Sequence, residues 1–449
     1  MFEVMPPEGW DEIPLGQLAG LRRGITYSSE MLGSHNEGLP YINMKSFLKG
    51  GGFNPKGLKE YSGLFSEDDF VEANDLLISN TDVTSGDIIG APALLPWKLA
   101  GQKVLYSHHV TRLRLEDTVT VSFLAQLLTL PQYRKLMLQN ARGTTVLMLD
   151  MQAIKKIPIR FPKAISVQKQ ICAVLDTLDT QIRQTEAIIA KLQQVKQGLL
   201  HDLLTRGIDA NGQLRPPRDQ APELYSKFSQ GYFPREWKEI KLGCMAEIVS
   251  GVTVGGNGTK SKSVAVPYLR VANVQDGYLD LNDIKSITVS AEEKERYRLE
   301  YGDVLMNEGG DFDKLGRGTV WEAQIQECIH QNHVFRVRVN REYLSPFFLA
   351  YWSASNYGKK YFVLSSKQST NLASINSTQL KAYPIMVPPA DEQEEIERRM
   401  RSINSKLGSY EHENDKLKKQ KSGLMDDLLT GRVRVNHLID TAQASEQDN

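Results

Sequence analysis

The chain has 449 residues, of which 41% are hydrophobic and 24% are charged, and its formal net charge is zero. This length exceeds what a single hydrophobic core usually serves, so we expect two or more domains. A net charge of zero argues against a protein that coats nucleic acid indiscriminately, but leaves sequence-specific binding through a local basic surface open. No apolar run approaches the roughly 20 residues that span a bilayer, and the N-terminus lacks signal-peptide features, so we expect a cytoplasmic protein.

Residues 1–163 are predicted to form a first globular domain of mixed α/β type. The alternation from Val110 to Leu115 indicates a strand with arginine on one face. Residues 122–139 carry Phe, Leu and Tyr at helical spacing, which is typical of a core helix. The domain ends through Pro158 and Pro162, and proline is well tolerated just before a helix.

Residues 164–205 carry the pattern of one long helix. Its apolar positions recur in alternating steps of four and three, which indicates a coiled-coil seam and not the wider stripe of a surface helix. About 40 helical residues at 1.5 Å each give a rod of roughly 60 Å. Residues 206–232 follow, and their glycines, prolines and mixed charge indicate a linker.

Residues 233–389 repeat the pattern of the first domain in order. The motif Trp-x-x-Ile-x-Leu-Gly at 10–16 returns at 237–243, and His-Val-x-Arg-x-Arg at 109–114 returns at 333–338. A second long helix at 390–432 carries the same seam, and a polar tail occupies 433–449. Ordered matches over half of the chain indicate an internal duplication.

Each long helix needs a partner, because alone it would expose a row of leucines, and the simplest partner is the other copy. An antiparallel pair places the end of the first helix beside the start of the second, which suits a short linker. Polar residues on the seam, namely Thr185, Lys196, Asn414 and Lys421, cost stability but fix register. The predicted packing positions are Ile171, Leu175, Leu178, Ile182, Ile189, Leu192, Leu199, Leu203, Ile396, Met400, Ile403, Leu407, Leu417, Leu424 and Leu428.

We therefore predict an α+β fold with two similar mixed α/β domains separated by two long helices. The helices would form an antiparallel coiled coil, with the domains at its opposite ends and an internal pseudo-two-fold symmetry between the halves.

The sequence carries few signs of catalysis. It lacks a P-loop, the Asp/Asn-Pro-Pro-Tyr/Phe tetrapeptide of adenine N6-methyltransferases, and a glycine-rich cofactor loop after a strand. The three cysteines are far apart and without metal-ligand spacing, and Cys172 beside the helix seam is expected to be a buried thiol. His109 and His333 precede equivalent strands, where a structural hydrogen bond is more probable than catalysis. We expect a protein that is not an enzyme and that binds no metal.

The two copies differ most in polar loops between the strands, while their framework agrees. Lys and Arg supply phosphate contacts that position a protein on DNA, and Asn, Gln, Ser, Thr and Arg can read base edges. The candidate DNA-binding residues of the first copy are Thr26, Tyr27, Lys45, Asn80, Thr81, Arg142, Thr144 and Thr145. Those of the second copy are Thr253, Lys260, Arg270, Asn273, Asn307, Lys367, Gln368 and Thr370.

The arrangement resembles the specificity subunit (HsdS) of type I restriction–modification systems. The resemblance rests on the motif at 237–243, on Gly302-Asp303-Val-Leu305, and above all on Pro388-Pro389-x-x-Glu392-Gln393 before the second helix. That helix ends in Asp-Leu-Leu-Thr-Gly at 427–431. The first copy departs mildly from the pattern, with Phe161-Pro162 for the proline pair and Val167-Gln168 for Glu-Gln. The resemblance covers essentially the whole chain.

The resemblance implies that each domain is a target-recognition domain that reads one half of a bipartite, asymmetric site in double-stranded DNA. The paired helices would set the spacer and dock two modification subunits, which methylate adenine with S-adenosylmethionine. Two restriction subunits with ATP- and Mg-dependent translocase activity can join such assemblies. No cofactor would be bound by this chain.

Two other interpretations stay open from the sequence. One is a coiled-coil adaptor whose globular domains bind proteins, which suits the neutral charge. The other is an adenine methyltransferase with its own specificity, which the missing tetrapeptide and cofactor loop argue against.

Overall fold

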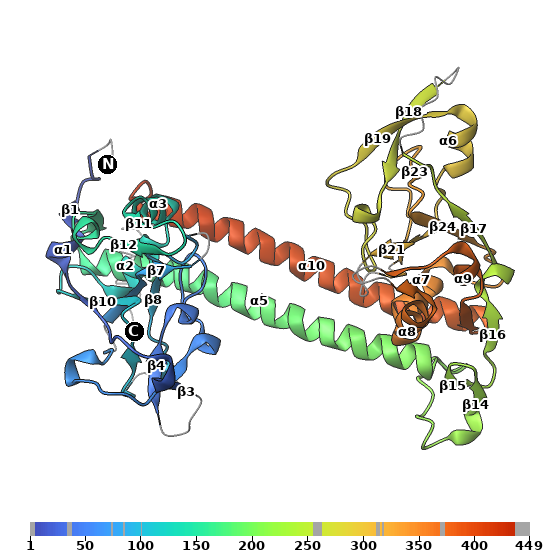
Figure 1. Ribbon diagram of the computed structural model, residues 1–449, viewed down its shortest axis with the longest axis horizontal. Coiled ribbons are helices and arrows are strands. Elements are labelled where there is room, and N and C mark those ends of the chain that lie inside the picture. Colours follow the sequence, from blue (N-terminus) through green and yellow to red (C-terminus); the bar gives the residue numbers. More distant parts are fainter. Residues whose placement is uncertain are drawn as a thin grey trace, which may run out of the picture. The chain divides into compact units, whose positions relative to one another are not determined.

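The computed structural model describes residues 5–33, 38–72, 75–83, 86–99, 101–254, 263–310, 315–316, 318–368 and 373–435. It divides into two compact units (Figure 1). Unit 1 contains residues 1–186 and 412–449, and unit 2 contains residues 187–411. Among the described residues, no helix combines the length and the apolar character that crossing a membrane requires.

Unit 1 is a mixed α/β unit whose described residues form four small sheets. Their strand orders are β1-β13, β2-β10-β6-β8, β11-β12-β7 and β3-β5-β4-β9. The strands are β1 (Trp10–Pro14), β2 (Ala19–Arg23), β3 (Leu32–Gly33), β4 (Leu39–Ile42), β5 (Lys59–Tyr61), β6 (Asp75–Ser79), β7 (Thr81–Asp82), β8 (Pro92–Leu94), β9 (Leu105–Tyr106), β10 (Val110–Leu115), β11 (Ala141–Arg142), β12 (Leu147–Leu149) and β13 (Pro158–Pro162). The helices are α1 (Leu15–Leu18), α2 (Val121–Leu128), α3 (Pro131–Gln139), α4 (Met151–Ile154), the first part of α5 (Ile165–Thr205) and the last part of α10 (Ala390–Leu429).

In the part of unit 2 that the structure describes there are five sheets, ordered β14-β15, β16-β27, β17-β24-β20-β22, β19-β18-β23 and β21-β26-β25. The strands are β14 (Tyr225–Phe228), β15 (Gly231–Pro234), β16 (Lys238–Lys241), β17 (Ala246–Ser250), β18 (Ser263–Leu269), β19 (Lys285–Ser290), β20 (Val304–Asn307), β21 (Gly309–Gly310), β22 (Gly318–Val320), β23 (Ile329–His330), β24 (Val334–Val339), β25 (Lys367–Gln368), β26 (Ala373–Ser374) and β27 (Pro384–Val387). The helices are the last part of α5, α6 (Ala291–Tyr297), α7 (Pro346–Ala354), α8 (Asn356–Ser365), α9 (Ser377–Lys381) and the first part of α10 (Ala390–Leu429).

The strand connections of the two units repeat, as the duplicated sequence predicts. The sheet β2-β10-β6-β8 corresponds to β17-β24-β20-β22, and the pair β1-β13 corresponds to β16-β27. In both central strands an arginine pairs with an aspartate at the start of the neighbouring strand β6 or directly before β20, with Nε–Oδ1 distances of 3.1 Å for Arg114–Asp75 and 2.8 Å for Arg338–Asp303. Each unit therefore holds the same framework of strands.

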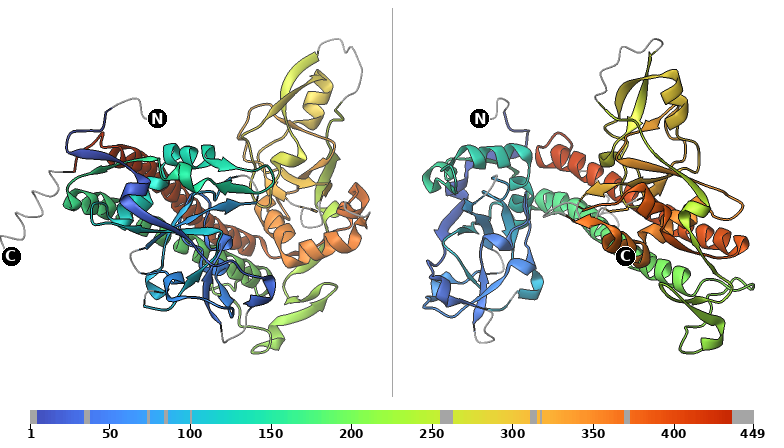
Figure 2. Two further views of the ribbon diagram at one scale, coloured as in Figure 1. Left: turned by 60° about the vertical axis from the view of Figure 1, so that its left-hand side comes forward. Right: turned by 45° about the vertical axis from the view of Figure 1, so that its right-hand side comes forward.

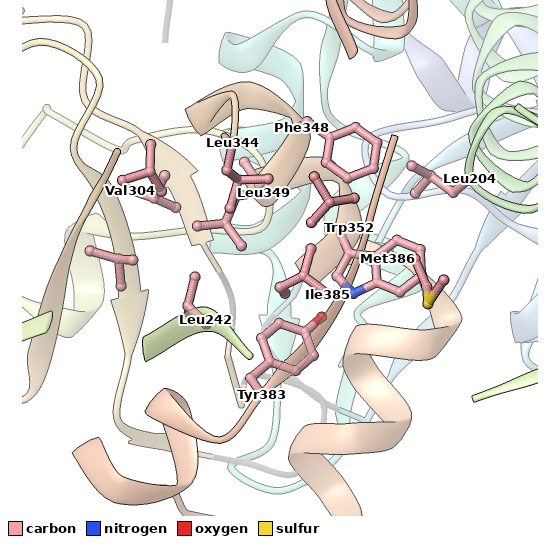
Figure 3. Close-up of a cluster of buried hydrophobic side chains, with 14 of the residues drawn as sticks. Leu204, Leu242, Val304, Leu344, Phe348, Leu349, Trp352, Tyr383, Ile385 and Met386 are labelled. Carbon is pink, nitrogen blue, oxygen red and sulfur yellow. The ribbon is translucent and has the colours of Figure 1, made fainter. Parts of the chain in front are cut away.

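The segment that the sequence predicted as one core helix is divided into two helices in the structure. Residues 122–139 form two helices, because Pro131 starts a second helix and lacks the amide N–H that continuation would need. In unit 2, α7 ends before Ser355, whose hydroxyl accepts from the amide of Gly358 and caps α8. Phe348 and Trp352 of α7 point into a core with Tyr383 and Ile385 beside β27 (Figure 3).

One glutamine at the start of each long helix holds that helix to its own domain. Gln168 accepts from the amide of Thr120 at 2.8 Å and donates to the carbonyls of Thr118 and Pro162. Gln393 makes the same three bonds in unit 2, with the Ser345 amide and the Tyr343 and Pro388 carbonyls. Both glutamines are at most 3% exposed, so their polar groups need these partners.

Both long helices contribute to the core of each unit, where they lie side by side (Figures 1 and 2). In unit 1, Ile171 and Leu175 near the start of α5 share a core with Leu428 near the end of α10. In unit 2, Leu203 near the end of α5 shares a core with Ile396 near the start of α10. Opposite ends of the two helices are thus buried together in each unit.

The segment predicted as a linker, residues 206–232, is a folded part of unit 2. It contains the hairpin β14–β15 and a buried ion pair in which Arg215 Nη1 lies 2.6 Å from Glu392 Oε1. The amide of Ile208, just beyond α5, donates to the same oxygen at 2.7 Å. The glycines and prolines of this segment therefore form turns of a folded structure. The contact also joins the end of α5 to the first turn of α10.

We predict that Gln393→Met lowers the free energy of unfolding by about 2–4 kcal/mol, because the Tyr343 and Pro388 carbonyls and the Ser345 amide lose their partner. Urea unfolding followed by circular dichroism measures the change. Glu394→Met, at the exposed neighbouring position, is the control and should shift the midpoint much less. Equal midpoints for the two variants would contradict the role of Gln393.

Burial also fixes the protonation state of His330 in β23. Its ring is fully buried, and Nδ1 donates to the carbonyl of Val334 at 2.7 Å. Burial lowers the pKa of His330 from 6.5 to about 4, so the imidazole is neutral at pH 7.

Because the unfolded chain binds this proton more tightly, the contribution of His330 to stability is complete above pH 6.5. It should decline as the pH falls toward 4, by up to about 3 kcal/mol. His330→Asn keeps a donor for the Val334 carbonyl and does not titrate, so its unfolding free energy should fall less between pH 6.5 and 4. Urea unfolding of both proteins at several pH values provides the measurement, and parallel curves would refute the prediction.

Candidate nucleic-acid interface

Two predicted base contacts of unit 1, Asn80 and Thr81, are only 1% exposed where β6 ends. Asn80 donates from Nδ2 to the carbonyl of His108 at 3.1 Å and accepts from the hydroxyl of Thr111. Thr81 Oγ1 lies 3.1 Å from Nδ1 of His109. These polar groups are thus used inside the unit and support its framework.

The same holds for Asn273 and Asn307 in unit 2. Asn273 donates to the carbonyls of Asp280 and Asp283 and accepts from the amide of Arg270 at 2.9 Å. Asn307 donates to the carbonyl of Val274 at 2.9 Å. Both are at most 3% exposed, so a proposal of base contacts must rest on the other candidates.

The remaining described candidates are exposed or half-buried. Arg142 pairs with Asp150 at 2.7 Å, and Arg270 pairs with Asp283 at 2.8 Å. The Arg270 guanidinium lowers the pKa of the Asp283 carboxyl through a hydrogen bond and its positive charge. The exposed candidates are Thr26, Lys45, Arg142, Thr144, Thr145 and Thr253, and the half-buried ones are Tyr27 and Arg270.

Four candidates lie wholly or partly outside the described residues. Lys260 and Thr370 are outside them entirely. Lys367 and Gln368 form β25, which pairs with β26, but their side chains are outside the description.

Several predicted loops of unit 1 meet at one edge of its central sheet. A bridge between Ile25 and Ser107 places the Thr26–Tyr27 loop beside the two histidines before β10. The hairpin β11–β12, which carries Thr144 and Thr145, pairs with β7 at the same edge. The Tyr27 and His108 ring centroids are 5.6 Å apart, and those of His108 and His109 are 3.9 Å apart. Lys45 lies elsewhere, in a short turn after β4.

The corresponding edge of unit 2 is assembled in the same way. A bridge between Val252 and Gln331 places Thr253 beside the residues before β24. The strand β21, which follows β20, pairs with β26, and β26 pairs in turn with β25. Here His333 Nδ1 lies 2.7 Å from Glu308 Oε2.

His108 and Glu308 are residues of these edges that the sequence did not single out. The sequence offered no sign of Glu308, because its partner His333 is distant along the chain. The structural hydrogen bonds expected for His109 and His333 are present. Burial and the neighbouring His108 lower the pKa of His109, so this ring is neutral at pH 7. Among the described residues, no group of three or more His, Cys, Asp or Glu could hold a metal ion.

The predicted helix-packing residues all face inward to some degree. Each of the predicted hydrophobic packing positions, from Ile171 to Leu203 and from Ile396 to Leu428, is buried or half-buried. Most of the positions between them on α5 and α10 are exposed. Of the polar seam positions, Lys421 pairs with Asp179 at 2.6 Å in unit 1. The residues between the seam positions leave a mainly polar outer surface.

Comparison with known proteins gives consistent matches over both copies. The family model described as the type I restriction modification DNA specificity domain matches residues 7–194 and 234–419. The type I restriction enzyme EcoKI specificity subunit of Escherichia coli K12 is 24% identical over 442 residues, which cover 95% of this chain and 89% of that protein. The putative MjaX specificity subunit of Methanocaldococcus jannaschii is 26% identical over 213 residues, 47% of this chain and 49% of that protein.

A solved structure supports the fold. The S subunit of a type I restriction–modification system from M. genitalium superimposes with a TM-score of 0.54 at 15% identity, covering 93% of this chain and 96% of that chain. The family model accounts for most of both halves of the sequence. The chain belongs to the type I restriction–modification DNA specificity family.

Proposed function

We propose that this chain is the DNA-reading subunit of a type I restriction–modification complex, and that each globular region reads one half of a bipartite, asymmetric site. The observation that carries the proposal is the match of both halves to the DNA specificity domain family, over one repeated strand framework with different loops. A repeated framework gives both readers the same orientation relative to their own helix. Different loops give them different base sequences to read.

The residues proposed to contact DNA are those that lie exposed or half-buried on the polar loops. They are Thr26, Tyr27, Lys45, Arg142, Thr144 and Thr145 in the first half and Thr253 and Arg270 in the second, with Lys260, Lys367, Gln368 and Thr370 retained from the sequence. Arg142 would have to exchange Asp150 for a DNA contact, which an exposed ion pair permits at little cost.

The two long helices are proposed to form an antiparallel coiled coil that sets the spacer between the half-sites. Burial of the seam positions and the shared cores of opposite helix ends support this arrangement. The ion pairs Asp179–Lys421 and Glu186–Lys418, at 2.6 and 2.8 Å, would define its register. The halves would then be related by a pseudo-two-fold axis.

Such an axis offers two equivalent surfaces on one chain, so we propose that two modification subunits dock on the helices. These partners would supply S-adenosylmethionine-dependent methylation of one adenine per strand. Restriction subunits with their ATP and Mg would join the same cytoplasmic complex, and the present chain would contribute recognition without chemistry.

Replacing both Thr144 and Thr145 with alanine should change only one half of the recognised sequence, because the hairpin belongs to one reader. Sequencing of methylated adenines in cells that carry the complex measures the motif. Thr253→Ala is the reciprocal control and should alter the other half alone. A change in both halves by either variant would contradict the assignment.

Deleting residues 188–194 and 407–413 together should shorten the spacer while both half-site sequences persist. One heptad at 1.5 Å per residue is about 10 Å, or roughly three base pairs of B-DNA. The deletion keeps the seam pattern, and Gln193→Ala with Glu411→Ala at exposed positions is the full-length control. An unchanged spacer in the methylated motif would mean that the helices do not set it.

A further inference from the structure

The two readers differ at one backbone position on the edge where their loops meet. Asn80 follows β6, and Glu308 follows β20. The amides of both donate to the carbonyl of the histidine before the central strand, His109 or His333. Their carbonyls accept from the amides of Leu149 and Ile375, which belong to equivalent connections. The same position therefore carries an amide side chain in unit 1 and a carboxylate in unit 2.

The two side chains are held differently. Asn80 is 1% exposed and bonded on both sides within unit 1. The Glu308 side chain is 32% exposed, and its Oε2 accepts from Nδ1 of His333 at 2.7 Å. Its other oxygen, Oε1, has no hydrogen-bond partner among the described residues. His333 thus fixes one oxygen of the carboxylate, and within the part of the chain that the structure describes the second oxygen keeps its capacity to accept a hydrogen bond.

This carboxylate lies among the loops that the sequence marks as recognition loops. Thr253 follows the bridge that joins Val252 to Gln331, two residues before His333. Gly309, directly after Glu308, pairs with Ser374 of β26, and β26 pairs with β25. Three segments that are distant in sequence therefore border the Glu308–His333 pair.

We propose that Glu308, aligned by His333, reads the exocyclic amino group of a cytosine or an adenine in the second half-site. This inference rests on the proposed function. In the major groove only cytosine N4 and adenine N6 present hydrogen-bond donors, whereas guanine presents N7 and O6 and thymine presents O4. A carboxylate accepts from an amino group and is repelled by the acceptor edges, so it favours one class of base and penalises the other.

Glu308→Gln tests the proposal, because the amide keeps the size of the side chain but can also donate to an acceptor edge. The full-length chain in complex with its modification subunits is used to select binders from duplex pools randomised over the site. The wild type should select C or A at one position of the second half-site by roughly tenfold or more. In the variant that preference should fall below about threefold, with the other positions unchanged. His333→Ala should weaken the preference at the same position only.

Glu292→Gln, at an exposed position of α6, is the charge-matched control and should leave all preferences as in the wild type. Thermal unfolding of each variant establishes that unit 2 remains folded. An unchanged preference in Glu308→Gln, or an equal loss of affinity for all sequences, would overturn the assignment of Glu308. A wild-type complex that selects no sequence at all would instead overturn the proposed function, and the inference with it.

Discussion

The structure depends on the way each long helix is attached to its own domain. Gln168 and Gln393 are buried at the starts of α5 and α10, and each joins its helix to two carbonyls and one amide of the preceding domain. A buried glutamine with unmet hydrogen bonds is costly, so these contacts fix the direction in which the helix leaves the domain. A helix whose direction is fixed at its start can carry that direction along its length, as the proposed role of the helices as a spacer requires.

The far end of each helix is fixed by a different set of contacts. Leu203 and Leu204 complete the core of unit 2, and Leu428 and Leu429 complete that of unit 1. Each unit therefore contains apolar residues from both halves of the sequence, so neither half has a complete core without the other. The Arg215–Glu392 pair adds a charged contact in unit 2, where the first copy has Val167 in place of the glutamate. The duplicated halves thus share a framework but differ in how their helix ends are joined.

The long-range order of the fold was readable from the sequence because it is encoded in repeats. The apolar seam, with its alternating steps of four and three residues, predicted long helices at residues 164–205 and 390–432. In the structure these helices run from Ile165 to Thr205 and from Ala390 to Leu429. The resemblance to specificity subunits is confirmed by the family match. The break at Pro131 was missed because the core-facing residues on both sides keep helical spacing. The predicted linker was read from its glycines and prolines, which reveal turns but not the buried pair that Arg215 forms.

The candidate site was less predictable, because the use of a polar side chain depends on neighbours that are distant in sequence. Asn80 and Asn273 have the chemistry of base-reading residues, but carbonyls of His108 and Asp283 satisfy them inside the units.

Glu308 is the opposite case, because nothing in its local sequence indicates a role in recognition. Only the fold brings His333 beside it. A framework that holds one strand end constant while the residue there changes from Asn80 to Glu308 can alter its specificity without altering its fold. The same physical logic applies to the loops around it, whose backbone anchors repeat while their side chains differ.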